Sequence, residues 1–344
     1  MKNLLELPID DIINQHSKIP KYRQVVDFFV TNISSGSFQI GDKIPSINEI
    51  SEEFLLSRDT VEKGFKHLQR RGIISAVRGK GFYVASTSRS DGHRILMLLN
   101  KLSDHKKTTY NAFTKRLGDT STVDLQIHNS DSRILEKIII ENLGRYDYYV
   151  IMPHLKQETE SVINAINQIP TEKLLLLNKD VAHVNGSYGC VYEDYENDIQ
   201  QALLTGITRI NKYKKLYLVF PTENYYCHGI RDGFVNFCIE HEFDYEMIHT
   251  TCGQHVHSHE LYIVIEETDL VEIVKKAAAK NLKLGKTIGI IAYNDSPFKE
   301  ILAGGISVLS TDFTRMGAEM ADMILTGVRK KIKNPFSLIM RSSI

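Results

Sequence analysis

The sequence has no net charge, no cysteine framework and no long hydrophobic run. Lys plus Arg number 42 and Asp plus Glu number 42, so any contact with nucleic acid must come from a local basic patch. The four cysteines, at positions 190, 227, 238 and 252, form no C-x-x-C pair and no zinc spacing, which favours reduced thiols over disulfides. Apolar runs such as 95–99 are far below the roughly 20 residues of a membrane span. Because acidic residues interrupt the start, MKNLLELPIDD, no secretory signal is predicted and we expect a cytoplasmic protein.

What the sequence does contain is the length and composition of a globular protein with more than one domain. It has 344 residues, of which 42% are hydrophobic and 24% charged, and about 150 residues per domain predicts roughly two domains. A small polar stretch, ASTSRSDGH, interrupts the hydrophobic pattern after Val84. We therefore predict an N-terminal domain over 1–84, a linker over 85–93 and a larger unit over 94–344.

Hydrophobic spacing in the first unit predicts three helices and a hairpin. The first helix ends near Gly36, and Ser46 and Ser57 are the expected N-caps of the second and third, which stops at Gly72. The expected buried stripes are Tyr22, Val25, Val26, Phe29 and Ile33, then Ile47, Ile50, Phe54 and Leu55, then Val61, Phe65 and Leu68. Residues 73–84 read as two short strands around a glycine turn, RGKG. Two short capped helices followed by a hairpin indicate a winged helix-turn-helix.

The third helix and the hairpin carry an excess of basic residues. Against only Asp59 and Glu62, the stretch 57–84 contains Arg58, Lys63, Lys66, Arg70, Arg71, Arg78 and Lys80. Such a patch neutralises phosphates and releases counterions, and the start of the helix is best placed to reach base edges. An ordinary solvated helix face is the alternative. The combination of this charge with two capped helices and a basic hairpin favours binding to DNA.

Residues 20–84 resemble the winged helix-turn-helix of GntR-family bacterial transcription regulators. The motifs that carry the resemblance are GDKIPS at 41–46, SRDTV at 57–61, L-x-x-x-G at 68–72 and GKGFYV at 79–84. The resemblance implies DNA contacts at Arg58, Thr60, Lys63, Gly79 and Lys80. Asn48 stands where the family commonly has arginine. The predicted DNA surface is completed by Ser46, Asn48, Ser57, Asp59 and Arg78.

In the larger unit, short apolar strands alternate with amphipathic helices. The expected strands cover 94–99, 123–128, 148–152, 173–178, 216–220, 261–266 and 288–293. This alternation predicts an α/β fold of parallel sheets flanked by helices, in which ligands bind beyond the carboxyl ends of the strands. Candidate effector contacts among the residues that follow these strands are Asn100, Lys101, His154, Asp180, Glu223, Asp269, Asn294 and Asp295.

The later part of the chain resembles the effector domain of LacI-type regulators, which share the fold of periplasmic sugar-binding proteins. The motifs are GIIAYND at 289–295, LSTDFTRMGAEMA at 309–321, MRSS at 340–343 and, more weakly, GIRDGF at 229–234. The resemblance implies a two-lobed clamp with a hinge near Tyr293 and Ser310, and effector contacts at Asn294 and Phe313. Tyr293 and Arg231 are further candidates, although the family's arginine would fall at Ile230. The alternatives are a simple turn at 294–295 and a core role for Phe313.

Three other patterns do not complete a site. His255, His257 and His259 would share one face of a strand, but no carboxylate or cysteine joins them at diagnostic spacing, so no metal is predicted. LGKT at 284–287 lacks the earlier glycine of a P-loop, because Lys280 occupies that position. No G-x-S-x-G elbow and no nucleophile with an evident base appear, so we predict no catalytic residue and no cofactor.

The sequence therefore predicts a ligand-responsive transcription regulator of carbohydrate-utilisation genes. A homodimer would hold two heads on operator DNA, and a small-molecule effector, a sugar or sugar derivative, would change their separation. A neutral sugar is the leading ligand, because amides and carboxylates bind hydroxyls while an aromatic ring packs on the sugar. Lys101, Lys106 and Lys107 would meet a phosphate or, more commonly, lie solvated. The alternatives are a DNA-tethered sugar-modifying or pyridoxal-phosphate enzyme and a sensor that has lost its ligand.

Overall fold

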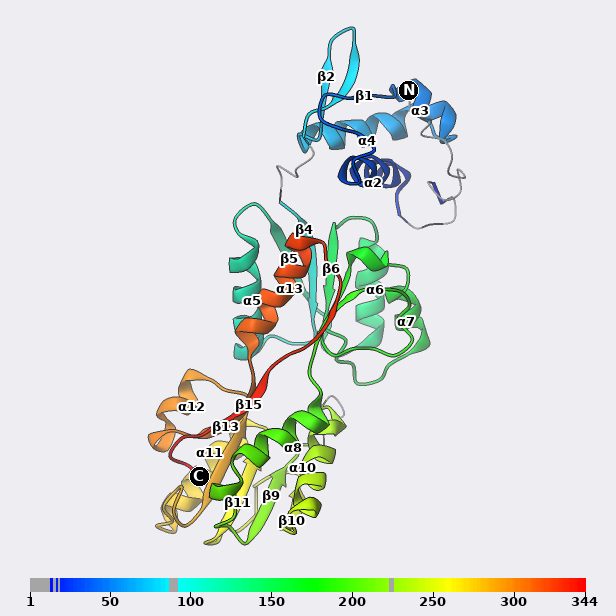
Figure 1. The fold of residues 1–344 in the computed structure, drawn as a ribbon. Coiled ribbons are helices and arrows are strands. Elements are labelled where there is room, and N and C mark those ends of the chain that lie inside the picture. Colours follow the sequence, from blue (N-terminus) through cyan, green and yellow to red (C-terminus); the bar gives the residue numbers. More distant parts are fainter. Residues whose placement is uncertain (1–12, 15–16, 18, 87–91, 223–225) are drawn as a thin grey trace.

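The chain forms a small head domain and two larger lobes arranged in line (Figure 1). The computed structural model describes residues 13, 14, 17, 19–86, 92–222 and 226–344. The head has a three-stranded sheet and each lobe a six-stranded sheet. Most of the predicted linker lies outside the described residues. No helix in the described ranges combines the length and the apolar character needed to span a bilayer.

The head domain has the elements of a winged helix-turn-helix. Its helices are α2 (Lys21–Ser34), α3 (Ile47–Glu53) and α4 (Arg58–Arg70), and its sheet has the order β1-β3-β2 with β1 (Lys43–Ile44), β2 (Ile74–Val77) and β3 (Gly81–Val84). The rings of Phe29 and Phe65 meet edge to face between α2 and α4, with centroids 5.4 Å apart. This aromatic contact joins the first helix to the third in the core.

Both predicted helix caps are confirmed. The Ser46 hydroxyl accepts from the backbone N–H of Glu49, whose carboxylate accepts from the N–H of Ser46 in return. The Ser57 hydroxyl accepts from the N–H of Thr60. The expected burial of Leu55 is wrong: its side chain is 75% exposed, because a left-handed backbone at φ 51° turns the chain out of α3 toward α4.

The first lobe is a parallel sheet with helices on both faces. Its strand order is β14-β8-β7-β6-β4-β5, with β4 (Arg94–Leu99), β5 (Thr122–Ile127), β6 (Tyr148–Ile151), β7 (Leu174–Asn178), β8 (Gly189–Tyr192) and β14 (Lys331–Lys333). Its helices are α5 (Asp104–Leu117), α6 (Ser132–Asn142), α7 (Glu160–Ile166) and α13 (Phe313–Thr326), with a 3-10 turn at Thr171–Lys173. Side chains of β4 alternate between the faces: Leu96 and Leu98 join a core with α6 and α7, and Ile95 and Met97 one with α5 and α13.

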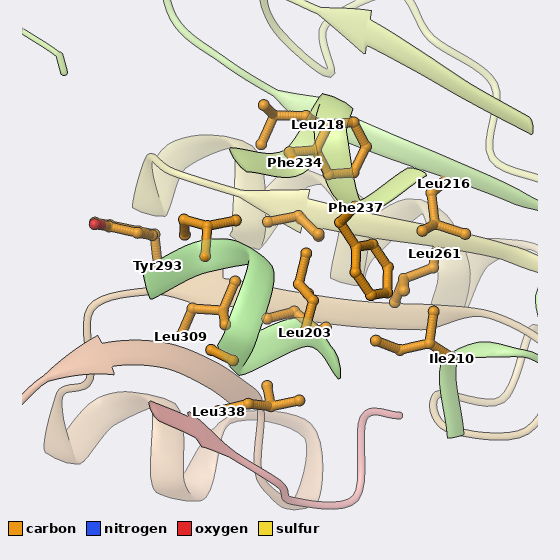
Figure 2. Close-up of a cluster of buried hydrophobic side chains, with 14 of the residues drawn as sticks. Leu203, Ile210, Leu216, Leu218, Phe234, Phe237, Leu261, Tyr293, Leu309 and Leu338 are labelled. Atoms are coloured by element: carbon orange, nitrogen blue, oxygen red, sulfur yellow. The ribbon is translucent and has the colours of Figure 1, made fainter. Parts of the chain in front are cut away.

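The second lobe repeats this plan with one antiparallel edge strand. Its order is β10-β9-β11-β12-β13-β15, with β9 (Lys215–Val219), β10 (Asp244–Ile248), β11 (Glu260–Val264), β12 (Gly289–Tyr293), β13 (Ser307–Thr311) and β15 (Phe336–Ile339), and only β15 is antiparallel. The helices are α8 (Tyr195–Thr205), α9 (Ile207–Ile210), α10 (His228–Glu240), α11 (Glu267–Ala279) and α12 (Pro297–Ile301), with a 3-10 turn at Leu302–Gly304. In Figure 2, Phe234 and Phe237 of α10 lie in one buried cluster with leucines of the sheet.

The chain crosses between the lobes three times. It passes from β8 to α8 through Glu193 and Asp194, from β13 to α13 through Asp312, and from β14 to β15 through Asn334 and Pro335. Ser310 therefore lies near a crossing, as the resemblance implies. Tyr293 is not itself in a crossing, because β12 ends inside the second lobe, but its ring lies 5.9 Å from the ring of Phe336, which directly follows the crossing at Asn334 and Pro335.

Candidate nucleic-acid interface and ligand cavity

The outer face of α4 and the tip of the hairpin form an exposed polar surface. Arg58, Asp59 and Lys63 are exposed on the helix, and Arg78, Gly79 and Lys80 are exposed in the turn between β2 and β3. The predicted inner stripe is confirmed, since Val61, Phe65 and Leu68 have no exposed surface. The hairpin projects away from the two lobes (Figure 1). This face of the head is open to a large partner.

The remaining residues of the predicted DNA surface lie beside this face. Ser46 and Ser57 cap α3 and α4, and the hydroxyls of Ser57 and Thr60 lie 2.8 Å apart. Asn48 is exposed in the first turn of α3. The Lys63 ammonium lies 4.4 Å from the centroid of the Tyr22 ring, so α2 positions this cation.

The turn of the hairpin depends on Gly79. Its φ is +75°, a backbone conformation that residues with a Cβ adopt only at a cost in free energy. A Cβ at this position would meet no other atom within 4 Å. Glycine is therefore needed for the shape of the turn rather than for space. The open surroundings leave the backbone between Arg78 and Lys80 accessible.

The head rests on the first lobe through a set of polar contacts. Arg71, which follows α4, forms an ion pair with Asp147 at 3.8 Å, and both side chains are only 11% exposed. Asp147 also accepts from the N–H of Arg94, the first residue of β4, at 3.0 Å. Lys173 and Asp27 pair at 2.6 Å. These contacts leave the start of α4 and the hairpin uncovered.

His67 lies beside the same contact. Burial, together with the positive charges of Arg23 and Arg71, lowers its pKa to about 4. The Arg23 guanidinium lies 3.3 Å from His67 Nε2 and reaches the Arg145 carbonyl at 3.1 Å. Because arginine can only donate, this imidazole is neutral and accepts at Nε2.

A cavity of about 510 Å³ lies between the two lobes. It opens beyond the carboxyl ends of strands from both sheets, where the parallel fold predicts a ligand site. The structure brings together seven of the predicted effector residues in its lining: Asn100, Lys101, His154, Tyr293, Asn294, Asp295 and Phe313.

Three predicted effector residues lie outside this lining and are held elsewhere. Asp180 accepts from the Tyr188 hydroxyl and pairs with Lys331, both at 2.7 Å. Arg231 pairs with its neighbour Asp232, and Ile230 faces the cavity instead. Asp269 accepts from the N–H and hydroxyl of Thr251 and from the hydroxyl of Thr250. Glu223 lies outside the described residues.

The backbone at 294–295 is the turn that the alternative interpretation predicts. Asn294 is left-handed at φ 59°, and its N–H donates to the Leu309 carbonyl at 2.8 Å. The buried Lys299 ammonium donates to the carbonyls of Tyr293 and Asn294. Arg341 holds the Asp295 carboxylate with two bonds of 2.9 and 2.7 Å. The Asp295 carboxylate is therefore already paired, while the Asn294 side chain lines the cavity.

Phe313 is a buried residue that also lines the cavity. It begins α13, whose Met316 and Met320 are fully buried, and is itself 9% exposed. Its ring lies 4.9 Å from the ring of His105 and lines the cavity. Burial lowers the pKa of His105 to about 3, so the imidazole is neutral.

The crossing at β8 adds a polar cluster that the sequence did not reveal. Burial raises the pKa of Glu193 to about 7, although hydrogen bonds with Tyr195 and Asn178 oppose this. The Tyr195 hydroxyl lies 3.0 Å from Asn178 Nδ2 and 3.4 Å from His154 Nε2. Burial also lowers the pKa of His154 to about 3. All four residues line the cavity at the junction of the lobes.

Lys106 also departs from expectation. Lys101 and Lys107 are exposed, but Lys106 is only 6% exposed and lines the cavity. Its ammonium donates to Asn100 Oδ1, and Asn100 in turn donates to the Ser130 hydroxyl at 3.2 Å. Burial, together with the positive charge of Lys101, lowers the pKa of Lys106 to about 7. The solvated interpretation of Lys106 is therefore wrong.

The sequence of the head matches a known family. The family profile described as "Bacterial regulatory proteins, gntR family" covers residues 21–84, the stretch from α2 to the end of β3. These residues form a GntR-family helix-turn-helix domain. The GntR-type head is 32% identical over 78 residues to the HTH-type transcriptional repressor YtrA of Bacillus subtilis, which is 23% of this chain and 60% of the repressor. The chain spans only 15% and 30% of two further Bacillus subtilis regulators.

The two lobes have the fold of LacI-family regulators. One solved structure, a LacI family transcriptional regulator from Lactobacillus casei with bound glucose, has a TM-score of 0.58 and 15% identity and covers 73% of this chain and all of that one. The lac repressor dimer bound to operator and the anti-inducer ONPF has a TM-score of 0.58 and 13% identity and covers 74% and 94%. The expected fold class is confirmed, and these relatives are named as regulators rather than enzymes.

Proposed function

We propose that the protein is a ligand-responsive bacterial transcription regulator that acts in the cytoplasm. The observation that carries the proposal is the union of a GntR-type head, whose basic face is turned away from the lobes, with a LacI-type fold that encloses a cavity of about 510 Å³. The head would bind operator DNA through Arg58, Thr60 and Lys63 of α4 and the tip of the hairpin. Ser46, Asn48, Ser57 and Asp59 border this surface.

The functional unit would be a homodimer. One head offers only a short helix and one hairpin, and two heads related by a two-fold axis would read two half-sites of a pseudo-palindromic operator. The solved lac repressor, which shares the fold of the lobes, is a dimer on its operator. Dimerisation would also make the distance between the heads sensitive to the shape of the lobes.

The effector would be a sugar or a sugar derivative. The cavity has the volume of a small-molecule site and combines aromatic side chains, Phe313 and Tyr293, with amides such as Asn294. A LacI-type relative with the same fold binds glucose. Such a ligand would favour one separation of the lobes over another, and its differential affinity would set the change in DNA affinity. The regulated genes would then serve carbohydrate utilisation.

The test is selection of DNA from a random pool by the purified full-length protein, followed by gel-shift titration of the enriched sequence. We expect a two-fold symmetric motif and a binding constant that falls steeply with salt. Arg58→Glu should weaken binding at least about tenfold, because it reverses a charge at the predicted groove contact. Lys115→Glu, on the exposed face of α5, is the matched control and should bind normally. Absence of sequence-selective binding at moderate salt would contradict the proposal.

A further inference from the structure

The wall of the cavity formed after β4 holds a buried lysine that no carboxylate contacts as an ion pair, and the negative charge of Glu193, in the lining of the same cavity, acts on it only from a longer distance. Lys106 is 6% exposed, and its ammonium donates to the neutral Asn100 amide. Among the described residues, no carboxylate oxygen lies within 4.0 Å of the Lys106 ammonium nitrogen, the distance that defines an ion pair. The next residue, Lys107, is exposed and pairs with Asp104 at 3.1 Å. A buried ammonium that keeps one neutral acceptor is costly unless a ligand supplies an opposite charge.

A second cation lies on the same wall. Lys101, two residues after β4, lines the cavity, and its ammonium lies 5.8 Å from the centroid of the Tyr226 ring, which belongs to the other lobe. Lys106 sits in the first turn of α5, where the Ser103 side chain accepts no hydrogen bond from the helix backbone and lies 3.0 Å from the Nε2 atom of His105 instead. The positive end of the helix dipole therefore adds to the two ammonium groups. This wall attracts an anion.

The opposite wall has acceptors for hydroxyl groups. Glu266 and Glu267, at the start of α11, and Asn294, after β12, line the cavity on the second lobe. Glu267 is largely exposed and lies 3.9 Å from Lys299. Carboxylate and amide oxygens accept hydrogen bonds from sugar hydroxyls and repel anions. A ligand that spans both walls needs an anionic group at one end and hydroxyls at the other.

We propose that the effector is a polyhydroxylated molecule with an oxyanion, a carboxylate or a phosphate, and that Lys106 binds this oxyanion with Lys101 beside it. The inference rests on the proposed function, which makes the cavity the effector site, and it replaces a neutral sugar with an acidic one. Burial lowers the pKa of Lys106 to about 7, and an anion bound at this position would raise that pKa and so favour the charged ammonium. Asn100 would orient the ammonium toward the ligand.

The experiment measures stabilisation of the full-length protein by four probes: inorganic phosphate, D-glucose 6-phosphate, D-glucuronate and D-glucose, all at constant ionic strength. We expect at least one oxyanion probe to raise the Tm, and D-glucose to have a smaller effect at the same concentration. The Tm with D-glucose 6-phosphate compared with the Tm with D-glucuronate distinguishes a phosphate ester from a carboxylate as the preferred oxyanion. Lys106→Met should weaken binding of the stabilising oxyanion at least about tenfold, the loss of one charge-assisted contact. Lys115→Met, exposed on the same helix, is the matched control and should retain wild-type affinity.

The outcomes separate this inference from the proposed function. Equal stabilisation by D-glucose, no stabilisation by any of the three oxyanions, or wild-type affinity in Lys106→Met overturns the acidic ligand. If D-glucose also alters operator binding, the regulator itself still stands. Conversely, oxyanion binding that requires Lys106 supports the inference even where no DNA is selected. If the Lys106→Met protein does not fold, Lys106→Gln, which keeps a polar group, replaces it in the binding measurement. The comparison of the four probes on the wild type requires no variant.

Discussion

At the scale of single residues, the interactions of the head could be predicted from the sequence because they join residues that are close along the chain. The interactions around the cavity could not, because they join residues that are far apart along the chain. Ser46 and Ser57 act on backbone groups three positions away, so their caps could be predicted from the sequence. The Asp295 carboxylate is bound by Arg341, which lies 46 positions later in the sequence, and no short sequence motif predicts such a pair. Lys106 follows the first strand like its neighbours, and only its place on the inner face of α5 distinguishes it.

The buried Lys106 should leave a signature in the pH dependence of stability. Its pKa is about 7 in the folded protein against 10.5 for the free side chain, so the unfolded chain binds more protons between these values. The stability of the wild type should therefore rise relative to that of Lys106→Met as the pH increases from 7 to 9, by up to about 1.4 kcal/mol per pH unit. Well below pH 7, where Lys106 is protonated in both the folded and the unfolded protein, the difference should be constant. The measurement is urea unfolding of both proteins across this range.

Lys115→Met is again the control, because it removes a lysine of the same helix whose side chain is exposed rather than buried. A stability difference between Lys106→Met and the wild type that does not change from pH 7 to 9 would mean that Lys106 titrates normally. The difference between variants is used because titrating groups that do not interact with Lys106 contribute equally to both proteins. Glu193, His105, His128 and His154 interact with Lys106, so their response to its removal is part of the measured difference.

At the scale of elements, strands with long apolar runs were predicted and short or polar ones were not. The seven expected strands occur within about two residues of their predicted bounds. The missed strands include β8 (GCVY), β14 (KIK) and β15 (FSLI), which are too short to show a period. Because β8 was not predicted, Glu193 and Tyr195 were not predicted as cavity residues either. Both lie in the crossing between the lobes that follows β8 or at its end.

The two helices on one face of the first lobe's sheet, α5 and α13, pack against each other through Gly317. A Cβ at this position of α13 would lie 2.3 Å from the Thr109 carbonyl oxygen and 2.9 Å from the Phe113 nitrogen of α5. Both are backbone atoms that cannot move independently of the helix. Gly317→Ala should therefore separate α13 from α5 and destabilise the protein by about 1–3 kcal/mol.

Because α5 carries Lys106, Gly317→Ala should also weaken the binding of any oxyanion probe that stabilises the wild type. Thermal unfolding with and without the probe measures both effects. Thr314→Ala, at an exposed position of α13, is the control and should change neither. A fully stable Gly317→Ala protein would show that the helices can move apart without cost.

At the scale of the whole molecule, the head and the cavity meet opposite ends of one strand. Asp147 binds Arg71 of the head and the N–H of Arg94, where β4 begins, and β4 ends at Leu99, directly before Asn100 of the cavity. The strand is buried along most of its length and is paired on both sides by β5 and β6. A displacement at the cavity would therefore reach the head through a stiff element.

Breaking the contact between Arg71 and Asp147 should uncouple the ligand from the DNA. Arg71→Glu places two carboxylates together at a site where both side chains are 11% exposed, so the head should leave the lobe. We expect operator affinity within about threefold of the wild type, but a ligand-induced change in affinity that is largely lost. Gel-shift titration with and without the stabilising probe measures this change.

The double variant Arg71→Glu with Asp147→Arg is the control, because it restores an opposite-charge pair and should recover part of the response. An unchanged response in Arg71→Glu alone would show that the head is coupled to the lobes by another route, such as the pair of Lys173 and Asp27.

Two of the three connections between the lobes are tied to each other. The Asn334 side chain, 1% exposed, donates to the Thr311 hydroxyl at 2.7 Å and to the Asp312 carbonyl at 3.0 Å, and the Asp312 N–H donates to the Pro335 carbonyl. Segments bonded in this way bend together and share one axis. Rotation about that axis would change the separation of the lobes and keep these hydrogen bonds, whereas sliding one lobe along the other would break them. A ligand that draws the two walls of the cavity together would therefore be expected to act on these two connections jointly.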